Sequence, residues 1–412
     1  MARRFPFRLF PLAGIALAAL ILAPAVSRAQ VVVKVSDTVN FRLGFQLQGW
    51  AEWLQDQTSK GYQQNFKIRR VRLILAGQVA KNVTFFFQTD NPNMGATVGT
   101  ATKALNSGFL VQDAFGEWHP FSNDMFILDF GKMLVPFTRN SLQSTSSHLA
   151  LDGGIWTFLQ SAPLQSDAGR DLGLQFKSYL VGDHLEIRAG VFDGLRLPAI
   201  ATAAGSRNPY RFVGRIVYNV FDTEKGYVPV GTNLGKKRIL AFGAGYDHQG
   251  GIDFPSTATT AEGKGYNAYG GDIMLDWPVG AGDMKNGMSA ITAHADYIHY
   301  DGGCGITPAG ARATNCLLPT LFKQQELFTD LGFYFKPLEI QPFIRFETEN
   351  FKEAIDHGRN IRRYMGGFNY YVAQQNMKIT AAFERIVPAS APATAQTKNT
   401  NHVVVQLQFY YF

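Results

Sequence analysis

The sequence predicts an all-β fold, a transmembrane antiparallel β-barrel of about 16 strands. Apolar and polar residues alternate in 16 segments, the pattern of strands with one face toward lipid and the other toward a polar interior. Beyond the N-terminus, no apolar run reaches the roughly 18–20 residues that a helical span needs. Short and long links alternate between the segments, as in a barrel whose turns are short on one side only. Only closure of the sheet would satisfy every backbone group in lipid.

The alternating segments extend from Val39 to the end of the chain. In the first segment the odd positions from Val39 to Leu47 are apolar, and the even positions from Asn40 to Gln48 are polar or glycine. The 16 predicted strands are 39–54, 66–79, 83–90, 110–118, 125–132, 171–181, 184–193, 210–221, 237–248, 264–277, 287–300, 325–335, 339–349, 362–373, 376–386 and 401–412. Each has about the length of a barrel strand.

The links between these segments predict which side of the membrane each occupies. Short links lie at 80–82, 182–183, 336–338 and 374–375, and longer ones follow 54, 90, 132, 193, 248, 300, 349 and 386. Short periplasmic turns and long external loops would place both termini in the periplasm. The link 222–236 is too long for a periplasmic turn, and the sequence offers no explanation for it.

The two ends of the chain indicate the same compartment. Residues 401–412 alternate and finish on Phe412, and this end resembles the closing strand of bacterial outer-membrane barrels. Residues 1–29 have a basic start, an apolar stretch and a small-x-small site at Ser27-Arg28-Ala29, which predicts a cleaved signal peptide and a single barrel over 30–412. A transmembrane anchor is the alternative, but the apolar run is too short and ends at Pro24.

Composition excludes several other classes. Residues 1–29 hold four arginines and no acid, so their removal lowers the formal net charge from +7 to +3 and leaves no case for nucleic-acid binding. A soluble sandwich or propeller would not explain the parity of the links, the terminal aromatic residue or the aromatic residues near strand ends, among 33 Phe and 16 Tyr. Cys304 and Cys316 share one Gly- and Pro-rich stretch and predict a disulfide in an external loop, with two free thiols as the alternative. Two cysteines alone make a poor metal site, and we expect no metal and no cofactor.

Three stretches carry a family resemblance. They are Phe66-Lys67-Ile68-Arg69-Arg70-Val71-Arg72-Leu73, Asp113-Ala114-Phe115-Gly116-Glu117 and Gly131-Lys132-Met133-Leu134-Val135-Pro136-Phe137-Thr138-Arg139. At these residues the chain resembles the phosphate-selective porin O/P family of bacterial outer-membrane porins, over essentially the whole mature length. Met133 and Leu134-Val135 depart from the family's usual pattern around the lysine.

The resemblance implies a function and a set of site residues. It implies a homotrimeric porin in outer-membrane lipid and lipopolysaccharide, through which small anions such as phosphate diffuse passively. It implies that the third external loop, 133–170, folds into the barrel and narrows it. The family's anion site of paired arginines, a lysine and an acid would correspond to Arg69, Arg70, Lys132 and Asp90.

The residues themselves support a basic constriction. In strand 66–79 the apolar Val71 and Leu73 must face lipid, so Arg70 and Arg72 should face the lumen. The same parity places Arg69 outward, unless it lies above the lipid at the external end of the strand. Guanidinium groups stay charged and present a rigid fork of donors that suits phosphate and carboxylate. Lys132, Arg139 and the hydroxyl residues Ser141, Ser144, Thr145, Ser146 and Ser147 would line the narrow part if the loop turns inward; a Ser-rich external loop is the alternative.

The sequence alone does not determine the selectivity of the predicted channel. The inward positions of all strands mix basic and acidic residues, so any anion preference must come from clusters such as strand 66–79, the start of the third loop, and Arg211 with Arg215. A general diffusion porin and a non-conducting structural or adhesin barrel are the alternatives. An enzyme is not expected, because no nucleophile, zinc or phosphate-loop motif accompanies the scattered histidines, and Gly243 and Gly245 lie inside a strand with no following helix.

Overall fold

The computed structural model describes residues 31–98, 102–103, 105, 108–154, 169–196, 209–253, 264–302, 323–352, 360–388 and 399–412. The predicted cysteine pair, Cys304 and Cys316, and the signal peptide lie outside the described residues. The described part holds no helix that is both long and apolar enough to cross a membrane.

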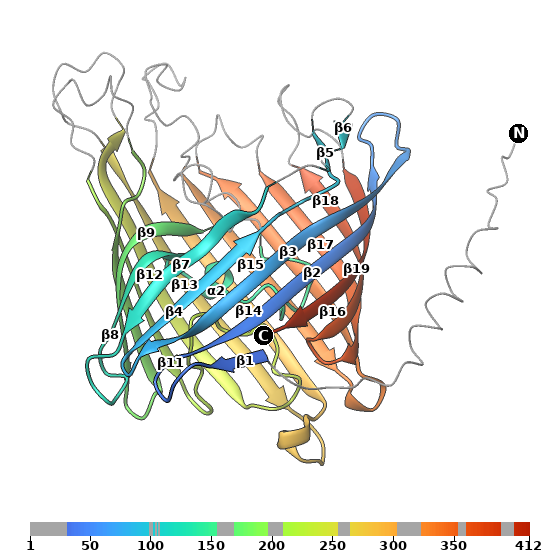
Figure 1. The fold of residues 1–412 in the computed structure, drawn as a ribbon. Helices are drawn as coiled ribbons and strands as arrows, with labels where there is room; N and C mark the ends of the chain where they lie inside the picture. Colours follow the sequence, from blue (N-terminus) through green and yellow to red (C-terminus); the bar gives the residue numbers. More distant parts are fainter. Residues whose placement is uncertain are drawn as a thin grey trace, which may run out of the picture.

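Sixteen antiparallel strands form a closed barrel (Figure 1), which confirms the predicted fold class. They are β2 (Asn40–Gln55), β3 (Tyr62–Ala80), β4 (Val83–Asp90), β7 (Leu110–Trp118), β8 (Ile127–Leu134), β9 (Arg170–Leu180), β10 (Leu185–Phe192), β11 (Arg211–Asn219), β12 (Ile239–Asp253), β13 (Lys264–Pro278), β14 (Ala290–Asp301), β15 (Gln324–Tyr334), β16 (Ile340–Phe351), β17 (Ile361–Ala373), β18 (Met377–Pro388) and β19 (Thr400–Tyr411). Each strand pairs with its neighbour in sequence, and β19 pairs with β2 to close the ring, with Gln408 opposite Gln48.

Several small elements were not predicted. The strand β1 (Val31–Lys34) pairs with the start of β2 below the point where β19 ends. A two-stranded hairpin, β5 (Thr97–Val98) and β6 (Thr102–Lys103), lies in the link that follows β4. The described residues also include two 3-10 turns, η1 (Met284–Asn286) and η2 (Lys336–Leu338), and one short helix, α2 (Arg139–Leu142).

The two faces of the wall have opposite chemistry. Phe66, Phe130 and Ile344 belong to a large set of exposed apolar side chains on the outer face, while Gln48, Asp129 and Gln408 on the inner face are buried. This arrangement is the one expected of a barrel in lipid with a polar interior, and it explains the alternation in the sequence.

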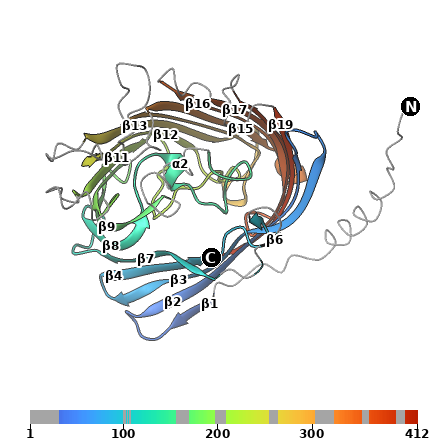
Figure 2. The ribbon, with the colours of Figure 1, turned by 90° about the horizontal axis from the view of Figure 1, so that it is seen from above.

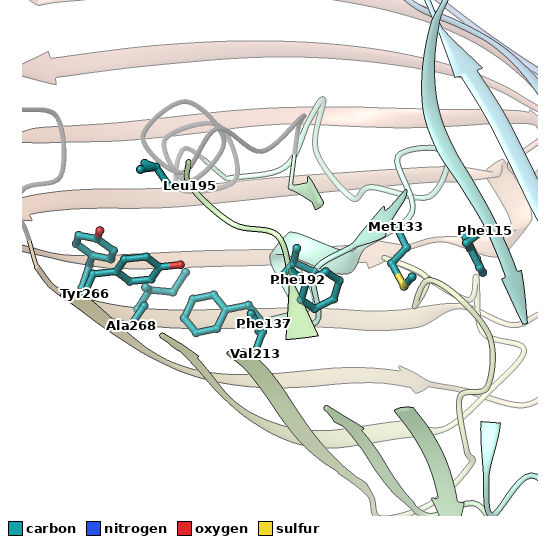
Figure 3. Packing of buried hydrophobic residues seen from close by; sticks show 11 residues of the cluster. Phe115, Met133, Phe137, Phe192, Leu195, Val213, Tyr266 and Ala268 are labelled. Atoms are coloured by element: carbon teal, nitrogen blue, oxygen red, sulfur yellow. The ribbon is translucent and has the colours of Figure 1, made fainter. Parts of the chain in front are cut away.

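The lumen holds an inward segment, residues 135–154, which includes α2. Figure 2 shows α2 inside the ring of strands. Met133, Val135 and Phe137 break the alternation, and all three are buried in an apolar cluster with Phe192 and Tyr266 from the wall (Figure 3). Because five consecutive apolar residues cannot all face lipid from one strand, the chain leaves the wall after β8 and packs against its inside.

Two inward-facing glycines make room for this packing. A Cβ on Gly245 of β12 would lie 2.0 Å from the Phe137 carbonyl oxygen, and one on Gly270 of β13 would lie 2.3 Å from the Thr138 side chain. Gly245, the last residue of the Gly243-Ala244-Gly245 sequence, and Gly270 are therefore the positions on which the inward segment docks.

The long link 222–236 between β11 and β12 also contacts the inward segment. Pro229 O accepts a hydrogen bond of 2.9 Å from the Ser144 backbone, and the Gly231 backbone donates one of 2.9 Å to Ser147 Oγ. The extra residues of this link therefore pack against the inward segment and support it.

Candidate functional site: an arginine-lined cavity

A cavity of about 440 Å³ lies between the inward segment and the wall formed by β2, β3, β4 and β7. Among the residues described, its charged lining consists of five arginines and three aspartates, with one histidine. These are Arg42, Arg69, Arg70, Arg72, Arg170, Asp90, Asp113, Asp152 and His148. The cavity therefore has a formal excess of two positive charges.

Arg69 points inward, which corrects the parity expectation. The pairing of β2 with β3 shifts at this point, from Gln48 opposite Arg70 to Gly49 opposite Ile68, so Arg69 is the extra residue of a β-bulge. A bulge lets two consecutive side chains lie on one face of a strand. Arg69 and Arg70 are consequently both buried in the lumen, where the sequence parity allowed only Arg70.

Asp152 of the inward segment bridges these two arginines. Its Oδ2 accepts hydrogen bonds from Arg69 Nε at 2.8 Å and Arg69 Nη2 at 2.6 Å, and its Oδ1 accepts one from Arg70 Nη2. Burial alone would raise the pKa of Asp152, but the Arg69 and Arg70 charges outweigh it and hold this pKa below the usual range. The carboxylate therefore stays ionised.

Arg72 has its own carboxylate partner. Its Nε donates to Asp90 Oδ2 at 2.9 Å, and its Nη1 donates to Thr145 Oγ1 of the inward segment at 2.8 Å. Arg72 thus links the wall to the hydroxyl run of the third loop. Asp90 lines the cavity next to Arg72.

A second bulge brings Gln112 and Asp113 of β7 to the same face. The register with β4 moves from Gln88 opposite Asp113 to Thr89 opposite Val111, which leaves Gln112 as the extra residue. Asp113 is fully buried and pairs with Arg170 at 3.2 Å. The sequence analysis did not select Arg170, at the very start of β9.

Tyr227 from the link 222–236 completes this side of the cavity. Its hydroxyl donates to Asp113 Oδ1 at 2.5 Å and accepts from the Leu134 backbone at 2.7 Å. Burial, with the Asp113 charge as a further cause, raises the pKa of Tyr227 well above its usual value, so the phenol remains a donor.

Lys132 does not reach the cavity. It lies opposite Ala114 of β7 and Leu172 of β9, and Leu172 is exposed on the outer face of the barrel. Its Nζ donates to Val111 O at 2.7 Å. The inward side chains of β8 are those of Asp129 and Met133, so the strand's alternation turns Lys132 outward. The expectation that Lys132 lines the constriction was wrong.

Arg139, Arg211 and Arg215 lie inside the barrel but away from the cavity. Arg139 makes a two-pronged pair with Glu224 of the link, at 2.7 and 2.9 Å. Arg211 pairs with Asp247, and Arg215 pairs with Asp272 while donating to Phe137 O at 3.2 Å. Each of the three is buried. Arg139 and Arg215 stabilise the inward segment, and Arg211 joins strands of the wall, whereas the sequence analysis grouped all three with the anion site.

His148 is a member of the cavity that the sequence analysis missed. It is 4% exposed, and neither ring nitrogen has a hydrogen-bond partner among the described residues. Burial is the main cause that lowers the pKa of His148 to about 3, so the ring is neutral at physiological pH. It therefore adds no charge to the cavity.

Arg42 marks the periplasmic end of the cavity. It is exposed, and its guanidinium group lies 4.5 Å from the centre of the Phe412 ring. Phe412 faces the lumen because Gly44 leaves room for it, with the ring 2.4 Å from where a Cβ would stand. The last residue of the chain therefore contributes to the cavity as well as to closure.

Among the described residues, no group of three or more His, Cys, Asp or Glu side chains could hold a metal ion. His294 lies 3.2 Å from Asp296 and packs against Phe328, which is a contact of the wall.

Comparisons with known proteins agree with this architecture. Residues 39–222 match the family model described as phosphate-selective porin O and P. No curated protein sequence matches the chain at a significant level.

Solved structures of low sequence identity share the fold. OprB of Pseudomonas putida is 8% identical with a TM-score of 0.59, covering 90% of this chain and 94% of that one. An anion-selective porin from Comamonas acidovorans is 11% identical with a TM-score of 0.56, covering 90% and 99%. OmpF of Salmonella typhi, in complex with daunomycin, is 13% identical with a TM-score of 0.54, covering 92% and 100%.

The family match includes both bulges, the cavity strands and the inward segment, and the closed barrel accounts for the rest of the described chain. The resemblance to the phosphate-selective porin O and P family is thereby confirmed over residues 39–222, and the barrel as a whole has the fold of bacterial outer-membrane porins.

Proposed function

We propose that this porin passes small hydrophilic solutes passively with a preference for anions, phosphate or similar oxyanions among them. The observation that carries the proposal is the charge of the cavity, where five arginines face three aspartates. The alternative is a general diffusion porin without marked selectivity.

The excess charge is concentrated where an anion could use it. Arg69 and Arg70 share the single carboxylate of Asp152, and Arg42 is exposed at the periplasmic end. Two unit charges ~4 Å apart at an effective dielectric constant of about 20 attract with roughly 4 kcal/mol before desolvation. A few such contacts can replace part of the hydration shell of an anion, while their sharing among several groups permits release.

The constriction would be the cavity side of the inward segment, with Arg69, Arg70 and Arg72 as the principal anion contacts. Asp90 and Arg170 would position them. We further propose a homotrimer in lipid and lipopolysaccharide. The support is the family match, together with the trimer form of the similar OmpT of Vibrio cholerae.

The test is the reversal potential of single channels in a planar bilayer with a KCl gradient, with and without phosphate. We expect a potential of the sign that indicates chloride permeation, and a chloride current that millimolar phosphate reduces. Cation preference would refute the anion proposal. An anion preference with no effect of phosphate would remove phosphate from the proposal and retain the rest.

A non-conducting barrel is a second candidate, because the inward segment and the link 222–236 both occupy the lumen. Purified protein that inserts into bilayers, shown by protease protection, yet never conducts would favour that candidate over a porin.

A further inference from the structure

We propose that the Asp152 carboxylate is a tethered counterion, which a permeating oxyanion displaces from Arg69 and Arg70, so that Asp152 sets the affinity of the constriction for anions. This proposal rests on the proposed anion preference, and it identifies Asp152 as the residue that limits the affinity for anions.

The first argument is the geometry of the contact. The two carboxylate oxygens of Asp152 separately engage the guanidinium groups of Arg69 and Arg70. An oxyanion with two free oxygens, whether a carboxylate or a phosphate, can present two negatively charged acceptor oxygens at that place. The protein's own side chain therefore occupies the position where such a solute would make its best contacts.

The second argument is access. The Asp152 side chain is 15% exposed, against 4% for Asp90 and 0% for Asp113, the other two acids of the cavity. Asp90 and Asp113 belong to wall strands and are enclosed by Gln112, Gln88 and Tyr227. Of the three carboxylates, Asp152 is the one that a solute in the cavity can reach.

The third argument is that Asp152 can release the arginines without undocking its segment. The backbone around it is held to the opposite wall, because Arg345 Nη1 donates to Asp152 O at 2.6 Å and Asn369 Nδ2 donates to Leu149 O at 2.7 Å. Within the segment, Gly154 N donates to Asn140 Oδ1 at 2.9 Å. Rotation of the Asp152 side chain alone would withdraw its carboxylate from Arg69 and Arg70, while Arg70 still donates to Gln48 Oε1 at 2.8 Å and Arg69 to Asn93 Oδ1 at 3.3 Å.

Asp152 would therefore compete with a permeating anion for Arg69 and Arg70. An arriving anion must displace Asp152 and then remains close to its negative charge, which weakens binding and favours release. A site with an uncompensated arginine pair would hold an oxyanion more tightly and pass it more slowly, since conduction requires weak enough binding to leave. Asp152 thus lowers the affinity of the site for anions and allows them to leave faster.

The experiment measures block of the single-channel chloride current by phosphate and, separately, by acetate. For Asp152→Asn we expect at least a tenfold lower half-blocking concentration and a higher chloride-to-potassium permeability ratio, at an open-channel conductance within twofold of wild type. Asp152→Glu, which keeps the charge, should stay within threefold of wild type. Asp37→Asn makes the same charge change at an exposed site whose partner is Lys34, and should change nothing.

The two blocking anions and the three variants distinguish the possible outcomes. Tighter block by both anions in Asp152→Asn supports a general oxyanion site, and tighter block by one of them assigns the site to that chemistry. Unchanged or weaker block, or a several-fold rise in conductance that shows the inward segment undocking, would overturn the proposal and make Asp152 a structural tether. Cation preference in the wild type would instead refute the proposed function itself.

Discussion

Inward-facing arginines line both sides of this barrel, yet the two sides use them differently. On the cavity side, five arginines and three aspartates border open space; four of the arginines lie on β2 and β3, and Arg170 lies at the start of β9. On the packed side, β11 to β13, Arg211 and Arg215 are each matched to a buried aspartate, and the inward segment lies directly on the wall. Both sides use arginine. The number of carboxylate partners decides whether these arginines can bind a solute or only stabilise the fold.

Backbone shape explains much of this difference. On the packed side, glycines at 245 and 270 let the inward segment approach the wall and exclude solvent. On the cavity side, bulges at Arg69 and Gln112 add polar side chains to the inner face. The glycines therefore leave space beside the wall on the packed side, and the bulges place additional polar side chains on the cavity side.

The largest expected effect is on the stability of the packed side. Arg215→Met leaves Asp272 buried without its cation, which should cost about 3–5 kcal/mol. Unfolding in detergent by heat or urea would measure this loss. Asp272→Leu added to Arg215→Met should restore most of the stability, because a buried pair can be replaced by apolar residues at little cost. If the single variant unfolded like wild type, the pair would not be structural.

The matching change on the cavity side should alter selectivity more than stability. Arg69→Gln with Arg70→Gln removes two positive charges and leaves three arginines facing three aspartates. We expect the chloride-to-potassium permeability ratio to fall to about one, as measured by reversal potential. Arg211→Gln is the control, since it removes an inward arginine outside the cavity. Equal losses of selectivity in both variants would remove the distinction between the two sides.

The sequence predicted the wall well because lipid enforces the alternation of each strand. The 16 strand positions, the closing pair β19 and β2, and the lumenal Arg70 and Arg72 all follow from that constraint. Alternation fails where the backbone bulges. Two adjacent polar residues between lipid-facing ones, as in Arg69-Arg70 and Gln112-Asp113, are the signal that could have revealed the bulges.

Other parts of the site could not be predicted from strand patterns. Asp152, Tyr227 and His148 lie in links, where no periodicity indicates direction, and only the folded chain brings them to β3 and β7. Lys132 was assigned through the family resemblance, although its own strand has the opposite parity.

Tyr227 tests whether the link 222–236 supports the cavity. Tyr227→Phe removes the hydroxyl that bridges Asp113 and the Leu134 backbone, and should cost about 1–3 kcal/mol because it leaves buried groups unpaired. We expect a lower unfolding temperature and noisier open-channel current, with the sign of selectivity unchanged. Tyr218→Phe on the exposed face is the control. A variant as stable and as quiet as wild type would assign the link no supporting role.

Acid should destabilise the inward segment, which contains His148 and Asp152. The folded-state pKa of His148 is lowered to about 3, so the unfolded chain gains a proton there between about pH 6.5 and 3 that the folded chain does not, and stability falls as the pH decreases through that range. The pKa of Asp152 is also lowered, so its contribution is lost only below about pH 4.

Denaturation in detergent at a series of pH values would measure this dependence. His148→Asn should flatten the decline between pH 6.5 and 4 and leave the steeper loss at lower pH. An unchanged pH profile in that variant would show that His148 is not the group responsible.

The smallest expected effect concerns Arg42, which tests how far the cavity side extends toward the periplasm. Its guanidinium group is exposed beside Phe412, so its charge is screened by salt more than those of the buried arginines. Arg42→Ala should lower chloride conductance by less than about twofold at 0.1 M KCl, where the Debye length is about 10 Å, and have no effect at 1 M, where it is about 3 Å. Stability should not change, because the described structure gives Arg42 only a ring contact in an open part of the lumen. A conductance loss that persists at 1 M KCl would mean that Arg42 contacts the anion directly, and the binding side of the barrel would then reach from Arg69 to the final residue of the chain.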